Sequence, residues 1–172
     1  NPDIASDGKN FFVVWQDSRD WLLDWWAIYG ARVKDVTGLL LDPIGIVISQ
    51  KFGNELYPCV SWNGEYYLVS YTCHDWNLPH TYWREHIWAT RISPGGGVID
   101  LGGFRLSAVT NRQIHSAISA PMDGSPFMVV WQELSDTGRW KIKCRKLDPR
   151  KRRSPWCAAC LLYTSDAADE GV

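Results

Sequence analysis

The stretch "SDGKNFFVVWQD" at residues 6–17 decides the fold, because a near-copy, "MDGSPFMVVWQE", returns at residues 122–133. A more divergent copy, "PCVSWNGEYYLVSYTC", occupies residues 58–73. Each copy carries one glycine directly after an Asp or Asn, and these glycines are Gly8, Gly64 and Gly124. A pattern that returns after 56 and then 60 residues indicates a chain built from structural repeats.

The start of each repeat predicts a tight β-hairpin. Asp-Gly and Asn-Gly dipeptides tolerate positive φ at both centres of a type I′ turn, so each is expected to join two strands through a two-residue loop. The run after each turn is apolar and rich in β-branched and aromatic residues, which is typical of a strand buried on both faces. In the second repeat this register places Cys59 opposite Leu68.

Two further elements complete each unit. A third strand is predicted from "IYGARV", "IWATRI" and "IKCRKL" at residues 28–33, 87–92 and 142–147. A Gly- and Pro-marked outer strand follows in two units, at residues 38–49 and 97–107, and is missing from the third. Each unit is therefore expected to be a four-stranded antiparallel meander, with the third unit incomplete.

A meander whose second strand is apolar on both faces needs a neighbouring sheet on each side. Radial stacking of such sheets gives a β-propeller, whose units of about 40–50 residues fit once the long loops are subtracted. An open β-sandwich, which buries one face of each sheet, is the alternative. We predict an all-β fold, a partial β-propeller of about three blades with exposed outer flanks. The expected blades are residues 1–56, 57–113 and 114–149.

These landmarks resemble a repeat of large secreted or surface-anchored bacterial proteins. Its units run approximately "D-G-x-x-(F/Y)-L-V-V-W-x-D", "D-I-Y-G-x-R-(V/I)" and "L-D-x-x-G-(I/F)-x-(I/L)-S". The first unit of this chain matches with "DGKNFFVVWQD", "IYGARV" and "LLDPIGIVIS", and the resemblance covers residues 2–149. It implies a propeller-like fold and an extracellular or cell-surface location, and it implies no activity.

The C-terminal segment 150–172 is expected to be a non-native tail. "CLLYTSDAADE", which begins at Cys160, resembles the conceptual translation of a sequencing adapter, so residues 160–172 are excluded from the fold. Cys157 and Cys160 form a C-x-x-C pair, but no second pair and no His at zinc spacing follows it. Three cysteines remain, an odd number, and they are expected to be small buried thiols. They are Cys59, Cys73 and Cys144.

Composition argues against several classes of partner. The net charge is −1 with acids and bases interspersed, which gives no electrostatic footprint for nucleic acid or an anionic membrane. No apolar stretch approaches the roughly 20 residues of a membrane span. The opening residues lack a signal-peptide pattern, and the chain is expected to be a fragment whose partners include further blades of a longer parent chain. No cofactor and no metal are predicted.

Recognition is expected in the loops where the repeats stop agreeing, at residues 16–27, 73–86 and 132–141. Aromatic side chains beside carboxylates suit stacking on sugar rings or anchoring of a protein partner. The candidate ligand-binding residues are Trp21, Trp25, Trp26, Trp76, Tyr82, Trp83, Trp140, Asp17 and Asp75. The alternative is that these rings cap the apolar ends of the blades or pack against a missing neighbour.

Other polar groups in the loops point less clearly to chemistry. The second loop holds His74, Asp75, His80, Glu85 and His86 at spacings that match no known metal site. The acids of the first loop lack the order of a calcium loop, and they are Asp17, Asp20 and Asp24. The repeated pairs Gln16-Asp17 and Gln132-Glu133 are expected to be structural, holding backbone amides between blades.

Three functions stay open at this point. The first is a non-catalytic module that recognises a glycan or a protein through its variable aromatic loops. The second is a glycoside-active propeller enzyme in which acids such as Asp17, Asp75 and Glu133 converge. The third is an architectural spacer. Regular repeats without a singular constellation favour the first and the third.

Overall fold

The computed structural model describes residues 1–19, 25–51, 53–75, 84–108, 110–148 and 160–164. The regular elements of this described part are β-strands. Within it, no helix is long and apolar enough to cross a membrane. The all-β prediction is confirmed.

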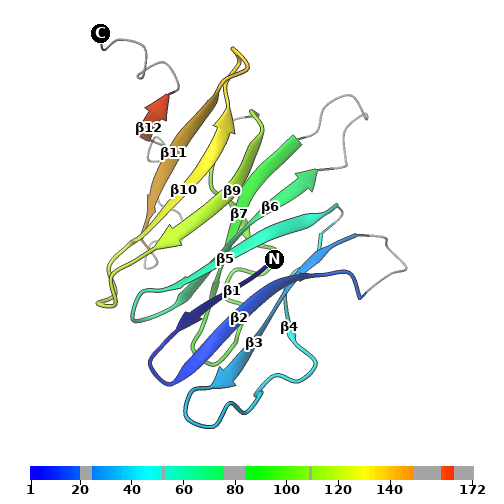
Figure 1. Ribbon diagram of the computed structural model, residues 1–172, viewed down its shortest axis with the longest axis vertical. Coiled ribbons are helices and arrows are strands. Elements are labelled where there is room, and N and C mark those ends of the chain that lie inside the picture. Colours follow the sequence, from blue (N-terminus) through cyan, green and yellow to red (C-terminus); the bar gives the residue numbers. More distant parts are fainter. Residues whose placement is uncertain (20–24, 52, 76–83, 109, 149–159, 165–172) are drawn as a thin grey trace.

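The strands form three antiparallel four-stranded sheets (Figure 1). The first sheet contains β1 (Pro2–Ser6), β2 (Asn10–Asp17), β3 (Ala27–Lys34) and β4 (Ile46–Ser49). The second sheet contains β5 (Glu55–Trp62), β6 (Tyr67–Asp75), β7 (Arg84–Ile92) and β8 (Phe104–Arg105). The third sheet contains β9 (Gln113–Ser119), β10 (Phe127–Leu134), β11 (Trp140–Leu147) and β12 (Cys160–Thr164).

The three sheets stack in chain order as an open fan, with β1, β5 and β9 in contact along its inner side (Figure 1). One apolar cluster joins the first and second sheets, where Phe12 and Val14 meet Tyr67 and Val69. A second cluster joins the second and third sheets and includes Leu68 of β6. Neighbouring residues of β6 thus pack into different clusters, because successive side chains of a strand point to opposite faces.

Burial on both faces is therefore confirmed for β6, the central strand of the stack. The equivalent strands β2 and β10 bury one face fully. Phe12 and Val14 are inaccessible in β2 while the residues between them are half-buried. In β10, Val129 is buried whereas Met128 is 42% exposed. β2 and β10 belong to the two outer sheets of the fan. Each outer sheet has one neighbouring sheet, so one face of each strand is less buried than the other.

The turns that open the first two sheets differ from the prediction. Trp62 pairs with Tyr67, so the turn between them spans four residues rather than two. Asn63 Oδ1 accepts hydrogen bonds from the backbone N–H groups two and three residues later, at 3.0 and 2.9 Å. Asp7 caps the first turn in the same way at 2.8 and 2.7 Å. Asn and Asp side chains that bond to nearby amides favour such Asx-type turns, which the dipeptide pattern alone does not reveal.

The longer turn also changes the register of the second sheet. Cys59 pairs with Ser70, and Leu68 pairs with Ser61, so the predicted pairing of Cys59 with Leu68 is wrong. A bulge between Leu56 and Cys59 shifts the remainder of the strand. The Cys59 thiol donates a hydrogen bond across the sheet interface to the carbonyl oxygen of Ser116 at 2.9 Å.

The cysteines Cys59, Cys73 and Cys144 are free thiols, as expected from the sequence. Cys73 and Cys144 are buried, and Cys59 is half-buried. Burial raises the pKa of the Cys59 thiol to about 11. A thiol that stays protonated at neutral pH is a poor nucleophile, so Cys59 acts as a small packing residue.

An arginine–aspartate pair recurs in the first two sheets. Arg32 donates two side-chain hydrogen bonds to Asp42, at 2.9 and 2.8 Å. Arg91 binds Asp100 with the same geometry, at 2.7 and 2.6 Å. Each pair ties the third strand to the segment before the short fourth strand. The bidentate geometry is the strong form of a charge-assisted hydrogen bond, and it explains why an arginine in the third strand and an aspartate in the following segment recur together in the first two units.

The third sheet has a fourth strand where the sequence predicts none. β12, from the segment assigned to the tail, pairs antiparallel with β11 through Lys141 with Thr164 and Cys144 with Cys160. Without β12, the edge of β11 would present unpaired backbone groups, and an apolar segment is suited to pair with such an edge. The third repeat itself supplies three strands, as expected, and the fourth strand of its sheet comes from outside the repeat.

Candidate functional site

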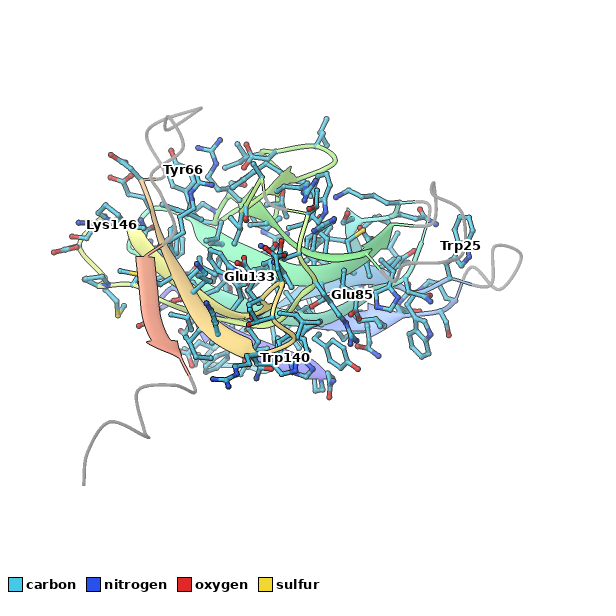
Figure 2. All side chains as sticks on the ribbon, turned by 90° about the horizontal axis from the view of Figure 1, so that it is seen from above. Trp25, Tyr66, Glu85, Glu133, Trp140 and Lys146 are labelled. Atoms are coloured by element: carbon cyan, nitrogen blue, oxygen red, sulfur yellow. The ribbon has the colours of Figure 1, made fainter. Side chains whose placement is uncertain are left out.

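The candidate site is the loop end of the fan. We define it as the ends of β2, β6 and β10, the starts of β3, β7 and β11, and the segments that lead into β5 and β9. The opposite end, where the turns opening each sheet lie, is called the hairpin end. Figure 2 views the molecule from above and shows Glu85 and Glu133 toward its middle and Trp25 at its edge.

Two of the expected aromatic residues are exposed at the loop end. Trp26 is 38% exposed, directly before β3, and Trp140 is 37% exposed, at the start of β11. The backbone N–H of Trp26 donates to Asn54 Oδ1 at 3.0 Å, and its carbonyl accepts from Glu55 N at 2.8 Å. The backbone carrying Trp26 is thus tied to the second sheet. The ring centroid of Trp140 lies 5.7 Å from the guanidinium carbon of Arg112, which is a cation–π contact.

Of the other expected site residues, some lie in the described part of the chain and some lie outside it. Trp25 is half-buried next to Trp26. Asp75 is the last residue of β6 and pairs with Arg84 through the backbone. Four aromatic residues lie outside the described residues, and they are Trp21, Trp76, Tyr82 and Trp83.

The Asp17 carboxylate is engaged by two side chains of its own repeat. Its carboxylate accepts hydrogen bonds from Trp15 Nε1 at 2.8 Å and from Arg19 Nε at 2.9 Å. The hydrogen bond from Arg19 is the main cause that lowers the pKa of Asp17 to about 2. Asp17 is ionised and engaged at neutral pH, so it serves to anchor the end of β2.

Glu85 forms an ion-paired cluster that crosses from the second sheet to the third. His74 Nε2 lies 2.8 Å from Glu85 Oε1, and Arg112 Nε donates to Glu85 Oε2. Burial alone would raise the pKa of Glu85, but the hydrogen bonds from His74 and Arg112 outweigh burial and hold the pKa below its ordinary value. Arg112 also faces Trp140, so the same guanidinium links the carboxylate to an exposed ring.

Glu133 is engaged in a comparable way. Gln113, which is fully buried, donates from Nε2 to Glu133 Oε2 at 2.7 Å. Lys143 Nζ lies 3.9 Å from Glu133 Oε1. On its other side, Gln113 Oε1 accepts from the backbone N–H of Ile87 in β7 at 3.5 Å. The group binds β9, β10 and β11 together and reaches the second sheet.

A third carboxyl, Glu55, is buried where the first sheet meets the second. Ser49 Oγ donates to Glu55 Oε1 at 2.6 Å, and Tyr71 Oη donates to Ser49 Oγ at 2.9 Å. Lys51 Nζ lies 4.0 Å from Glu55 Oε1 and 3.2 Å from the ring centroid of Trp88. Burial raises the pKa of Glu55 to about 7 and lowers the pKa of Lys51 to about 8. Within this Lys51–Glu55 cluster the Glu55 side chain is inaccessible to solvent, with 0% exposure.

The polar pair at the exit of β2 has the structural role expected for Gln16. Gln16 Oε1 accepts a hydrogen bond from the backbone N–H of Tyr57, in β5 of the next sheet, at 3.2 Å. Asp3 makes a second joint of this kind, accepting from the N–H of Val60 at 2.8 Å. The acidic residues of the two repeated pairs differ from Gln16, because the carboxylates of Asp17 and Glu133 are hydrogen-bonded to residues of their own sheets.

Among the described residues, no three His, Cys, Asp or Glu side chains converge as a metal site. His74 and Glu85 of the predicted second-loop set do come together, as an ion pair with Arg112. His80 lies outside the described residues. Sequence reasoning missed Arg112 and Gln113, whose partners lie 27 and 20 residues away in the chain. The available signal was two adjacent polar residues at the start of the first strand of the third repeat.

Comparison with known proteins gives one informative likeness. No protein-family model matches the chain, and no curated protein sequence matches it. Among solved structures, a Cellvibrio cellulosa alpha-L-arabinanase in complex with arabinohexaose matches with a TM-score of 0.51 and 14% sequence identity. The match covers 93% of this chain and 56% of the arabinanase chain. The chain therefore spans a little over half the length of that protein.

At this level of identity the likeness concerns the fold. It supports a propeller-like arrangement of the three sheets, in agreement with the blades expected from the repeats. The open fan in Figure 1 is not a closed propeller.

Proposed function

We propose that this chain is part of an extracellular, non-catalytic propeller module that binds a glycan through its loop end. The observation that carries the proposal is the pair of exposed rings, Trp26 and Trp140, on different sheets at the same end of the fan. The Arg112 guanidinium lies over the Trp140 ring, and the Asn54 side chain accepts a hydrogen bond from the backbone N–H that carries Trp26. An apolar ring flanked by polar groups suits a sugar, whose faces are apolar and whose hydroxyls need partners.

The comparison with the arabinanase supports the choice of a glycan over a protein as the ligand. That protein is in complex with arabinohexaose, and the match covers 93% of this chain. Propeller sheets of this kind are thus compatible with an oligosaccharide ligand. The extracellular location is part of the proposal and is supported by the resemblance of the repeats to those of secreted proteins.

The state of the carboxyl groups supports binding without catalysis. Glycoside hydrolysis requires two carboxyl groups that flank the substrate in different environments. Asp17, Glu85 and Glu133 are each bound by a cationic or amide side chain. Glu55 has the raised pKa of a general acid, but it is fully buried. The described carboxylates therefore serve the joints between strands and sheets.

Affinity electrophoresis through gels that contain arabinan, xylan, galactan or β-glucan tests this proposal. At least one polysaccharide is expected to retard the wild-type chain, and Trp26→Ala and Trp140→Ala are each expected to weaken binding about three- to tenfold, the range of one lost aromatic contact. Tyr66→Ala, an aromatic substitution at the hairpin end, is the matched control and is expected to migrate like the wild type.

Two results would contradict the proposal. If no polysaccharide retards the wild-type chain, or if the tryptophan variants bind as well as the Tyr66 control, the loop end is not a glycan site. If soluble sugars accumulate in the polysaccharide solutions, the module is a glycoside-active enzyme, the alternative left open by the sequence.

A further inference from the structure

The two interfaces inside the fan are built from equivalent positions. In the second and third sheets five apolar positions on β-strands face the preceding sheet, and they occupy equivalent positions in the strand pairing. In the second sheet these residues are Val60, Tyr67, Val69, Tyr71 and Ile92. In the third sheet they are Ile118, Phe127, Val129, Trp131 and Leu147. All ten belong to or pack against the two apolar clusters, so this set is the face by which a sheet docks on its predecessor.

The first sheet carries the same set on its outer face. The equivalent residues are Ile4, Phe11, Val13, Trp15 and Val33, paired with each other in the same register as in the other sheets. Strand alternation places Phe11, Val13 and Trp15 opposite Phe12 and Val14, which face the second sheet. No described sheet covers this outer face (Figure 1). Ile4 is 54% exposed there, whereas its equivalent Val60 is buried.

The third sheet carries the complementary face. Phe12 and Val14 of the first sheet pack on the second sheet, and their equivalents in β10 are Met128 and Val130. These residues point away from the second sheet, and Met128 is 42% exposed. The fan thus ends in two different apolar faces at its two sides, each being one half of an interface that the chain forms twice within itself.

We propose that these two faces bind each other between copies of this chain, with the outer face of the third sheet of one copy docked on the outer face of the first sheet of another. Such a contact is heterologous, or head-to-tail, and it continues the fan with a third interface of the kind already present twice. The occupant is a second copy because, among the surfaces that the structure describes, this chain itself offers the complementary set of residues in the required register. A generic apolar partner would not select between the two faces.

Sedimentation velocity over a range of protein concentrations tests the proposal, using substitutions of residues that are exposed and therefore compatible with folding. Wild-type chain is expected to associate as its concentration rises. Ile4→Lys and Met128→Lys each place a charge in one face, and each variant alone is expected to associate at least about tenfold more weakly. Leu101→Lys, at an 86% exposed position in the turn between β7 and β8, is the matched control and is expected to behave as wild type. Circular dichroism verifies that all variants fold.

The decisive sample is an equimolar mixture of the two face variants. Ile4→Lys keeps the third-sheet face and Met128→Lys keeps the first-sheet face, so the mixture is expected to form one-to-one dimers that do not grow further. A wild-type chain that stays monomeric at all concentrations would overturn the proposal. So would a single face variant that still associates, since that indicates like-with-like contact, or a mixture that stays monomeric. None of these outcomes depends on whether the loop end binds a glycan.

Discussion

Replacement of Glu55 by Gln is expected to remove a pH dependence from the stability of the fold. Glu55 is inaccessible to solvent at the junction of the first and second sheets, where Ser49 Oγ and the backbone N–H of Lys51 donate hydrogen bonds to its carboxyl group. Its Oε2 atom is buried without a partner. Ionisation of this carboxyl therefore costs free energy in the folded state, and Lys51 at 4.0 Å offsets only part of that cost.

The sign of the effect follows from the raised pKa. The unfolded chain releases this proton near its ordinary pKa of 4.5, whereas the folded protein keeps it until about 7. Between these values the folded state binds more protons, so the free energy of unfolding falls as pH rises. At about 1.36 kcal/mol per unit of pKa shift, the loss between about pH 5 and about pH 8 is about 2.5 kcal/mol. Above about pH 8 this contribution stays constant.

Urea unfolding of the wild type, Glu55→Gln and Glu65→Gln at both pH values measures the effect. All other ionisable groups are common to the three proteins, so their contributions cancel when the variants are compared. The wild type and Glu65→Gln, whose substituted carboxyl is exposed, are expected to lose about 2.5 kcal/mol more than Glu55→Gln does. Equal losses in all three proteins would refute the assignment of a buried neutral carboxyl at Glu55.

Three further substitutions test the turns, the cores and the ion pairs. Gly64→Ala places a Cβ 2.7 Å from the carbonyl oxygen of Met122, at a residue with positive φ. Its loss of stability in urea unfolding is expected to be at least twice that of Gly8→Ala, where only the backbone strain of about 1 kcal/mol applies. Equal losses for the two variants would contradict the contact between the turns. Phe127→Ala is expected to cost about 3–5 kcal/mol because the ring fills the cluster between the second and third sheets, and a cost under about 1 kcal/mol would argue against that cluster. Asp42→Asn is expected to cost about 1–2 kcal/mol at neutral pH. Because its arginine partner lowers the pKa of Asp42, this cost should vanish as the pH falls through that pKa, and a cost that persists in acid would refute the pairing.

The repeat was predictable from sequence because each blade needs the same turn and the same apolar strand. Gly8, Gly64 and Gly124 do open the three sheets at positive φ, and Gln16 does hold a backbone amide of the next sheet. The alternation of buried and half-buried residues in β2 follows from its position at one side of the fan. That position depends on which sheets are present, which a local pattern does not contain.

The turn type and the fourth strand of the third sheet were not predictable in the same way. The capping of two amides by Asn63 depends on a side-chain rotamer, and it lengthens the turn and moves Cys59 by two positions. The pairing of β12 depends on the free edge of β11. Neither effect changes the dipeptide or the apolar pattern from which the prediction was made.

The candidate site was predictable in location more than in detail. The loops that differ between repeats do carry the exposed rings Trp26 and Trp140. The groups that fix the surroundings of these rings come from elsewhere, since Asn54 and Arg112 lead into the first strands of the following sheets. Such long-range partners are set by the stacking of sheets.

Hydrogen exchange with and without a bound polysaccharide tests the central claim most directly, using the polysaccharide that retards the chain most in affinity gels. The account predicts slower exchange at the loop end, around residues 25–27, 111–113 and 134–141, with no change at the turns of the hairpin end, residues 7–10 and 63–66. Protection confined to the hairpin end, or spread evenly over the three sheets, would contradict a glycan site at the loop end.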